Sequence, residues 1–175
     1  MRLGVMCSGE GTNFENILRY PQMHHEVVLM IHNTKKCGAV KRAAKFGIPH
    51  VRVAHKDEDQ MIQLFKAWRV DLIILAGYMR VLKKPSEFHC PIINVHPSLL
   101  PKYKGLHAVE QALESGDKET GCSVHYVNEE LDGGEIIEQS RVPICPDDTV
   151  ETLTHRIQRA EYRLLPLVIN ELQTS

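Results

Sequence analysis

An asparagine and a histidine stand two positions apart at the end of a short apolar run in the middle of the chain. Asn94 and His96 follow Pro91-Ile92-Ile93. In an extended chain, side chains at i and i+2 point to the same face, so the amide and the imidazole can converge on one ligand atom. Such a pair is suited to stabilising and protonating a carbonyl under attack. Most Asn-x-His pairs make only ordinary loop hydrogen bonds, so the pair alone does not identify a site.

A carboxylate in a glycine-rich turn could complete this chemistry. Asp132 lies in Leu131-Asp132-Gly133-Gly134, later in the chain than His96. A carboxylate near an imidazole favours the imidazolium and fixes its orientation. Asp-Gly-Gly is also a good turn in its own right, and the residues alone leave that interpretation open.

A second candidate site lies near the start of the chain, in Ser8-Gly9-Glu10-Gly11-Thr12-Asn13. Glycines allow positive φ, and the free amides at a helix start face an anion, which suits a phosphate monoester. Phe14 stands where a dinucleotide fingerprint needs its third glycine, and no Gly-Lys-Ser/Thr follows as in a Walker motif. A tight turn with a helix cap is the alternative.

The elements that must position these residues alternate between strands and helices. We expect strands at 2–7, 27–31, 51–53, 71–76, 92–95, 122–127 and 135–142. We expect helices at 13–19, 37–46, 57–69, 107–115 and 149–172, the last one interrupted or kinked at Pro166. This alternation predicts an α/β fold, a doubly wound sheet with sites at the carboxyl ends of its strands, in one domain over residues 1–175.

Composition is ordinary for a globular protein and excludes several classes. The chain has 175 residues, 43% apolar and 25% charged, with a net charge of −1, so no charge of one sign points to nucleic acid or an anionic membrane. Met1-Arg2 leads directly into a strand-like run, and no apolar stretch reaches the length of a membrane span. The five cysteines form no C-x-x-C pair, which favours neither zinc nor disulfides. We expect a cytoplasmic protein.

Three blocks together resemble the folate-dependent formyltransferases, and most closely the branch that acts on glycinamide ribonucleotide. The blocks are residues 8–13, the run from Asn94 to Gly105, and Ser123-Val124-His125-Tyr126-Val127 leading into the Asp132 turn. They occur in the order found in that family. The resemblance implies a Rossmann-like, mostly parallel sheet with an antiparallel C-terminal portion. It also implies that the N-terminal half binds phosphate and the C-terminal half binds folate.

The resemblance implies an activity as well. Enzymes of this branch transfer the formyl group of 10-formyltetrahydrofolate, their co-substrate, to the amine of glycinamide ribonucleotide in purine biosynthesis, without a metal. It assigns Asn94, His96 and Asp132 to catalysis. The implied partners are small molecules only, with no nucleic acid or membrane, and the chain is expected to be a monomer or homodimer.

The resemblance also assigns binding residues. Those for the substrate are Gly11, Thr12 and Asn13 at its phosphoribosyl end, with Gln158 and Glu161 on the last helix. Those for folate are Met79, Arg80, Val81, Leu82, Asn94, His125, Val127, Asn128, Glu129, Glu130 and Asp132. The planar fork of Arg80 suits the glutamate carboxylate of folate, although a surface arginine after a strand is common.

The chain departs from the family pattern around residues 53–60. This segment is shorter than usual, and an arginine often found there has no clear counterpart, which leaves the contacts to the folate tail open. Formyltetrahydrofolate hydrolase uses the same three catalytic residue types and is one alternative. A formyltransferase with another amine acceptor and a non-catalytic nucleotide-binding module are two more. Most of the remaining histidines, His32 and His50 among them, are expected at the surface or in loops.

Overall fold

A computed structural model describes residues 1–172 of the chain. Seven strands make up one sheet: β1 (Arg2–Cys7), β2 (Glu26–His32), β3 (His50–Arg52), β4 (Leu72–Leu75), β5 (Ile92–His96), β6 (Glu119–Tyr126) and β7 (Ile136–Pro143). The helices are α1 (Thr12–Arg19), α2 (Gly38–Lys45), α3 (Glu58–Ala67), α4 (Ala108–Ser115) and α5 (Val150–Glu171), with a short 3₁₀ turn, η1 (Pro85–Glu87).

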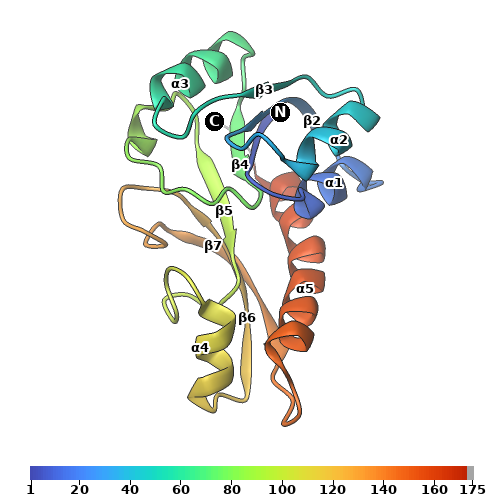
Figure 1. The fold of residues 1–175 in the computed structure, drawn as a ribbon, viewed down its shortest axis with the longest axis vertical. Helices are drawn as coiled ribbons and strands as arrows, with labels where there is room; N and C mark the ends of the chain where they lie inside the picture. Colours follow the sequence, from blue (N-terminus) through green and yellow to red (C-terminus); the bar gives the residue numbers. More distant parts are fainter. Residues whose placement is uncertain (173–175) are drawn as a thin grey trace.

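The sheet has the order β3-β2-β1-β4-β5-β6-β7, which confirms the predicted fold class. Strands β3, β2, β1, β4 and β5 pair in parallel, while β6 and β7 are antiparallel to their neighbours. Figure 1 shows the consequence: β1 to β4 and helices α1 to α3 lie together, β6, β7 and α4 extend away from them along β5, and α5 runs from that far end back to α1. The β5 strand therefore joins the two parts.

Two apolar clusters, one on each face of the sheet, hold the helices. Alternate residues of β1 explain how: Leu3 and Val5 belong to the cluster that includes α1, α2 and α5, whereas Met6 belongs to the cluster that includes α3. Gly4 lets α3 approach, because a Cβ there would lie 2.5 Å from the ring of Phe65. No helix within residues 1–172 is long and apolar enough to cross a membrane.

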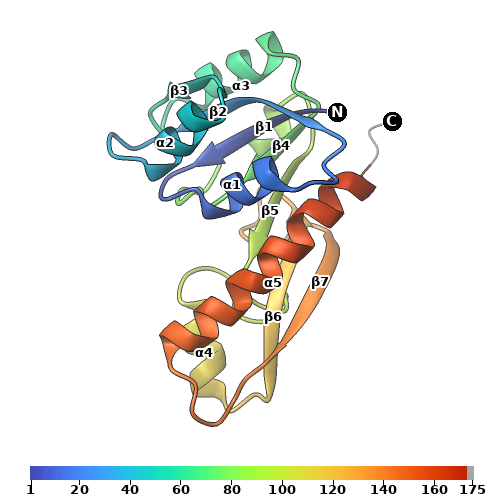
Figure 2. The same cartoon turned by 90° about the vertical axis from the view of Figure 1, so that its right-hand side faces the viewer.

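Helix α5 is continuous across Pro166, so of the two predicted outcomes, an interruption or a kink, the interruption is wrong; Figure 2 shows one helix running beside β6 and β7. Proline has no N–H and cannot donate to the carbonyl of Tyr162, four residues earlier. The side-chain amide of Asn16, on α1, donates to that carbonyl instead, at 2.6 Å. This contact replaces the missing helical hydrogen bond and ties α1 to α5.

The role of the Asn16 side chain as a replacement for the N–H that Pro166 lacks can be tested. Asn16→Ala should lower the free energy of unfolding by about 1 kcal/mol, because the Tyr162 carbonyl loses its partner. In a Pro166→Ala background the N–H of residue 166 can donate to the Tyr162 carbonyl, so Asn16→Ala should lower the free energy of unfolding by clearly less. Urea unfolding of the four chains gives both values. Equal costs in the two backgrounds would contradict the compensation.

Candidate functional site

The predicted site residues meet at the carboxyl edge of the parallel strands. Met6, Leu75 and Asn94 lie in register across β1, β4 and β5. With neighbouring strands about 4.8 Å apart, the end of β1 lies roughly 10 Å from Asn94. The loops that follow these three strands therefore meet over one short edge, as expected for a doubly wound sheet.

His96 is buried at this edge and is held between two oxygen atoms. Its Nε2 donates to the carbonyl of Tyr103 at 2.7 Å, and its Nδ1 lies 3.5 Å from Oδ2 of Asp132. The same Asp132 oxygen accepts a hydrogen bond from the backbone N–H of Gly105 at 2.7 Å. Only a ring that is protonated on both nitrogens can donate to Tyr103 and Asp132 at once. The predicted pairing of His96 with Asp132 is thus present as a contact.

A second histidine faces the other oxygen of Asp132. His125 donates from Nδ1 to the carbonyl of Tyr126 at 2.9 Å, and its Nε2 lies 3.7 Å from Oδ1 of Asp132. Burial lowers the pKa of His125 below its ordinary value, against the opposing effects of the Tyr126 hydrogen bond and the Asp132 charge. The neutral ring presents Nε2 as an acceptor, and this buried atom has no partner within residues 1–172. One donor group placed between Nε2 and Oδ1 would satisfy both.

Unusual backbone geometry fixes these groups. Tyr103 and Asp132 both have positive φ, 55° and 51°, which non-glycine residues seldom adopt and which aspartate tolerates better than tyrosine. The loop that carries Tyr103 is fastened to β6 by Ser123, whose hydroxyl donates to the Ser98 carbonyl at 2.7 Å and accepts from Leu100 N at 3.0 Å. The His96 partner is therefore set by a rigid loop.

A cavity of about 410 Å³ opens beside these residues. Six large hydrophobic side chains are exposed within residues 1–172, and four of them line it: Met79, Val81, Leu106 and Leu131. Met79 and Leu106 are 70% and 72% exposed. Exposed apolar groups gathered around a few polar ones are typical of a small-molecule site, here one for a ligand with an apolar part.

The residues expected to bind folate lie around this cavity, with one exception. Those that line it are Met79, Arg80, Val81, Leu82, Asn94, His125, Val127, Asn128, Glu130 and Asp132. Glu129 does not; its carboxylate accepts from Ser86 N, in η1, at 3.3 Å. Sequence reasoning missed Leu106 and the Tyr103 carbonyl as parts of the site. An apolar residue directly after Gly105 was the available signal for Leu106.

The loop at residues 8–13 has the geometry of an anion site. Gly11, with φ of 74°, is the N-cap of α1 and makes no side-chain hydrogen bond to the helix. The first amides of any α-helix lack a helical acceptor, and here no N-cap side chain replaces it. A side chain at Gly11 would meet Ala39, with Cβ atoms 2.6 Å apart. A larger residue there would displace α2 as well as disturb the loop, so Gly11 is not a clean position at which to test anion binding.

Asn13 and Glu161 meet across 148 positions of sequence. Nδ2 of Asn13 donates to Oε1 of Glu161 at 3.2 Å, and the buried Oδ1 of Asn13 has no partner in the part of the chain that is described. Burial raises the pKa of Glu161 to about 7, and the Asn13 hydrogen bond opposes that rise. Gln158 lies one turn earlier on α5, on the same face as Glu161. These predicted residues therefore share one place beside the α1 start.

Two side chains that sequence reasoning missed hold the segment 77–84 at its ends. The hydroxyl of Ser8 accepts from Met79 N at 2.9 Å and donates to Asn33 Oδ1 at 2.7 Å. At the other end, the buried carboxylate of Glu58 accepts from Lys83 N at 2.8 Å and Lys84 N at 3.0 Å. Ser8 thus joins the 8–13 loop to the wall of the cavity.

Metal ligation has no candidate group here. Among residues 1–172, no cluster of three or more histidine, cysteine, aspartate or glutamate side chains could hold a metal ion.

The chain is similar to known proteins along nearly its whole length. The sequence model of the family described as formyl transferase matches residues 1–169. Phosphoribosylglycinamide formyltransferase of Haemophilus influenzae is 38% identical over 96% of this chain and 85% of its own. The trifunctional purine biosynthetic protein adenosine-3 of Drosophila melanogaster is 43% identical over 97% of this chain, which spans only 14% of that protein's length.

Solved structures show the same likeness. The phosphoribosylglycinamide formyltransferase of Anaplasma phagocytophilum superposes with a TM-score of 0.92 at 39% identity, over 97% of this chain and 84% of that one. Glycinamide ribonucleotide transformylase 1 of Symbiobacterium toebii gives a TM-score of 0.91 at 38% identity, over 97% and 85%.

The burial of Glu161 predicts a pH dependence of stability. Its folded pKa of about 7 lies above the ordinary 4.5, so the folded chain binds more protons than the unfolded chain between these values. This group's contribution to stability therefore falls as pH rises from about 4.5 to about 7, by roughly 3 kcal/mol at most. Glu161→Gln should remove that fall. Chemical unfolding of both chains at pH 5 and pH 8 measures it, and a stability difference that does not change with pH would refute it.

The Ser8 contact predicts a local change in dynamics. Ser8→Ala should speed hydrogen exchange at the Met79 amide about fivefold, since a hydrogen bond of about 1 kcal/mol is lost. Thr34→Val is a matched control, because it removes only the hydroxyl that donates to the Ser8 carbonyl. If both changes speed exchange at Met79 equally, the Ser8 hydroxyl does not hold this segment.

Proposed function

The chain belongs to the formyl transferase family, and we propose that it transfers the formyl group of 10-formyltetrahydrofolate to the amino group of glycinamide ribonucleotide, in purine biosynthesis. The observation that carries the proposal is the convergence of Asn94, His96 and Asp132 beside an apolar-walled cavity. The Asn13–Glu161 contact beside the α1 start supports the choice of acceptor.

The acceptor is positioned by the N-terminal loop and α5. Its phosphate binds the free amides at the start of α1, where the helix dipole favours an anion. Its ribose hydroxyls donate to the carboxylate of Glu161, which can accept more than one hydrogen bond. Gln158 adds a polar group on the same helix face. The amine then reaches towards Asn94, roughly 10 Å from the end of β1.

The formyl donor occupies the cavity. Its flat pterin ring packs among the four exposed apolar side chains that line the cavity, Met79, Val81, Leu106 and Leu131. Arg80, at the same cavity, binds the glutamate carboxylate of the folate tail. Leu75 and residues 78–82 line the cavity together with residues from the second half of the chain, so the proposed folate site draws on both halves and not on the C-terminal half alone.

In the reaction the amine attacks the formyl carbon, a C–N bond forms, and negative charge develops on the formyl oxygen. Asn94, on β5 and at the cavity, donates to that oxygen from its side-chain amide. His96, protonated and held by Tyr103 and Asp132, stabilises the same charge. The bond from carbon to N10 then breaks, and the intermediate collapses to the formylated product.

One proton must pass from the attacking amine to the departing N10. The two acceptors that face each other, Asp132 Oδ1 and His125 Nε2, are 3.7 Å apart and suit a bridging water. Such a water takes the proton from the amine with Asp132 as the base and returns it to N10.

Asp132→Asn tests this mechanism. Asparagine tolerates the positive φ of this turn, so the change removes the charge while the backbone is kept. The kcat should fall by about 10²- to 10⁴-fold, and KM for glycinamide ribonucleotide should change far less. Asp147→Asn, at an exposed position, is the control. Near-normal turnover by Asp132→Asn would remove this carboxylate from the mechanism. If the unaltered chain releases formate without glycinamide ribonucleotide as fast as it transfers the formyl group in its presence, a hydrolase becomes the better assignment.

A further inference from the structure

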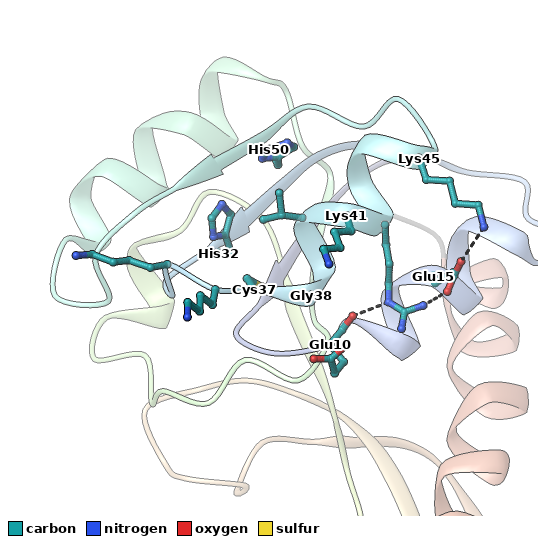
Figure 3. A pocket seen from close by; sticks show the side chains of 12 residues that line it. Glu10, Glu15, His32, Cys37, Gly38, Lys41, Lys45 and His50 are labelled. Atoms are coloured by element: carbon teal, nitrogen blue, oxygen red, sulfur yellow. Dashed lines mark hydrogen bonds and ion pairs between the residues drawn. The ribbon is translucent and has the colours of Figure 1, made fainter.

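A second hollow of about 790 Å³ lies beside the start of β3 and over α2, and its lining is basic (Figure 3). Five lysine and arginine residues line it against two glutamates: Lys35, Lys36, Lys41, Arg42 and Lys45 against Glu10 and Glu15. The whole chain carries a net charge of −1, so this groove concentrates positive charge on an otherwise acidic protein. A concave surface with charge of one sign raises the local concentration of ions of the other sign.

The basic residues divide into two groups. Glu15 is bound by Arg42, by Arg19 at 3.1 Å and by Lys45 at 3.9 Å, so its charge is already neutralised. Lys35, Lys36 and Lys41 are exposed and make no ion pair among residues 1–172. These three cations, which we call the lysine rim, are free to bind a ligand with several negative charges.

The groove also has a neutral aromatic part. His32, which was expected at the surface or in a loop, is buried on β2, and its Nδ1 donates to the Thr34 carbonyl at 3.0 Å. Burial lowers the pKa of His32, and the charges of His50 and Arg52 act in the same direction against the Thr34 hydrogen bond. Its ring lies 6.0 Å from that of His50, centroid to centroid. A neutral ring suits a sugar hydroxyl or a base better than a phosphate.

Glu10 belongs both to the loop proposed to bind the acceptor's phosphate and to the lining of this groove. Its carboxylate lies against the first turn of α2. A Cβ built at Gly38 would lie 2.7 Å from Glu10 Oε2, so glycine leaves room for this carboxylate. The carbonyls of the same loop are bound from α2: Gly9 O accepts from Ala39 N at 3.1 Å, and Glu10 O accepts from Arg42 Nε. The groove and the loop are therefore neighbours with separate sets of donors.

We propose that this groove is a second ligand site, which binds a nucleoside polyphosphate with its phosphates on the lysine rim and its sugar or base against His32. A single phosphate would use only part of three separate cations, and the volume is in the range that nucleotide-sized ligands occupy. The inference does not depend on the catalytic role proposed for the other site, because its test measures binding alone.

The test is calorimetric titration of the full chain with ATP in EDTA, at low and at physiological salt. Lys35→Gln, Lys36→Gln and Lys41→Gln combined should weaken binding at least tenfold. A matched variant with Lys56, Lys66 and Lys118 changed to glutamine, all exposed and outside the groove, should bind as the unaltered chain does. Absence of ATP binding, or equal losses in the two variants, would overturn the proposal.

Two further arms identify the ligand class and the place. ATP should bind more tightly than tripolyphosphate or adenosine, and His32→Gln should remove most of its advantage over tripolyphosphate. Equal binding of tripolyphosphate and ATP would mean an inorganic anion site and would overturn the nucleotide assignment. Asn13→Ala should leave ATP binding unchanged, whereas loss of ATP binding in this variant would place the ligand in the 8–13 loop instead. Thermal unfolding checks that each variant is folded.

Discussion

The candidate active site depends on the contacts of one group, the buried carboxylate of Asp132. One of its oxygens accepts from Gly105 N and faces His96, and the other faces His125. Its positive φ places it there from a turn between β6 and β7, while Gly105 belongs to the long loop after β5. A buried charge is costly unless hydrogen-bond donors or opposite charges surround it, and here the Gly105 N–H and the His96 imidazole do so. The same contacts that stabilise the carboxylate therefore also define the reacting geometry.

The second constraint is the alignment of three parallel strands. Because β1, β4 and β5 end together, their loops meet without any long-range adjustment of the backbone. Side chains then fix the loops relative to one another: Ser8 joins the β1 loop to Met79, and Glu58 anchors the far end of the β4 loop. The positions of both proposed substrates thus depend on a few polar contacts between loops, while the two apolar clusters hold the sheet and helices beneath them.

Much of this could be predicted from the sequence, and the part that could not has a physical reason. Short apolar runs located every strand, although the predicted strand 92–95 ended one residue before His96, which lies on β5 together with Asn94. Contacts that join distant loops left no local pattern: Glu58 binds amides 25 and 26 positions away, and the Tyr103 carbonyl has no side-chain signature. Pro166 misled for the same reason, because its compensating donor, Asn16, lies in another helix.

Glu161 shows how such a site trades stability for binding. Glu161 is buried on α5 and accepts one hydrogen bond, from Asn13, so its ionised form is solvated less well than it would be in water. This is why its pKa rises to about 7. A ligand that donates two hydroxyls would supply the missing hydrogen bonds and favour the ionised form. The unsatisfied Oδ1 of Asn13, buried beside it, would gain a partner from the same ligand. We propose that a polyhydroxylated ligand bound beside α1 offsets this cost, and that the pair thereby helps to select the acceptor.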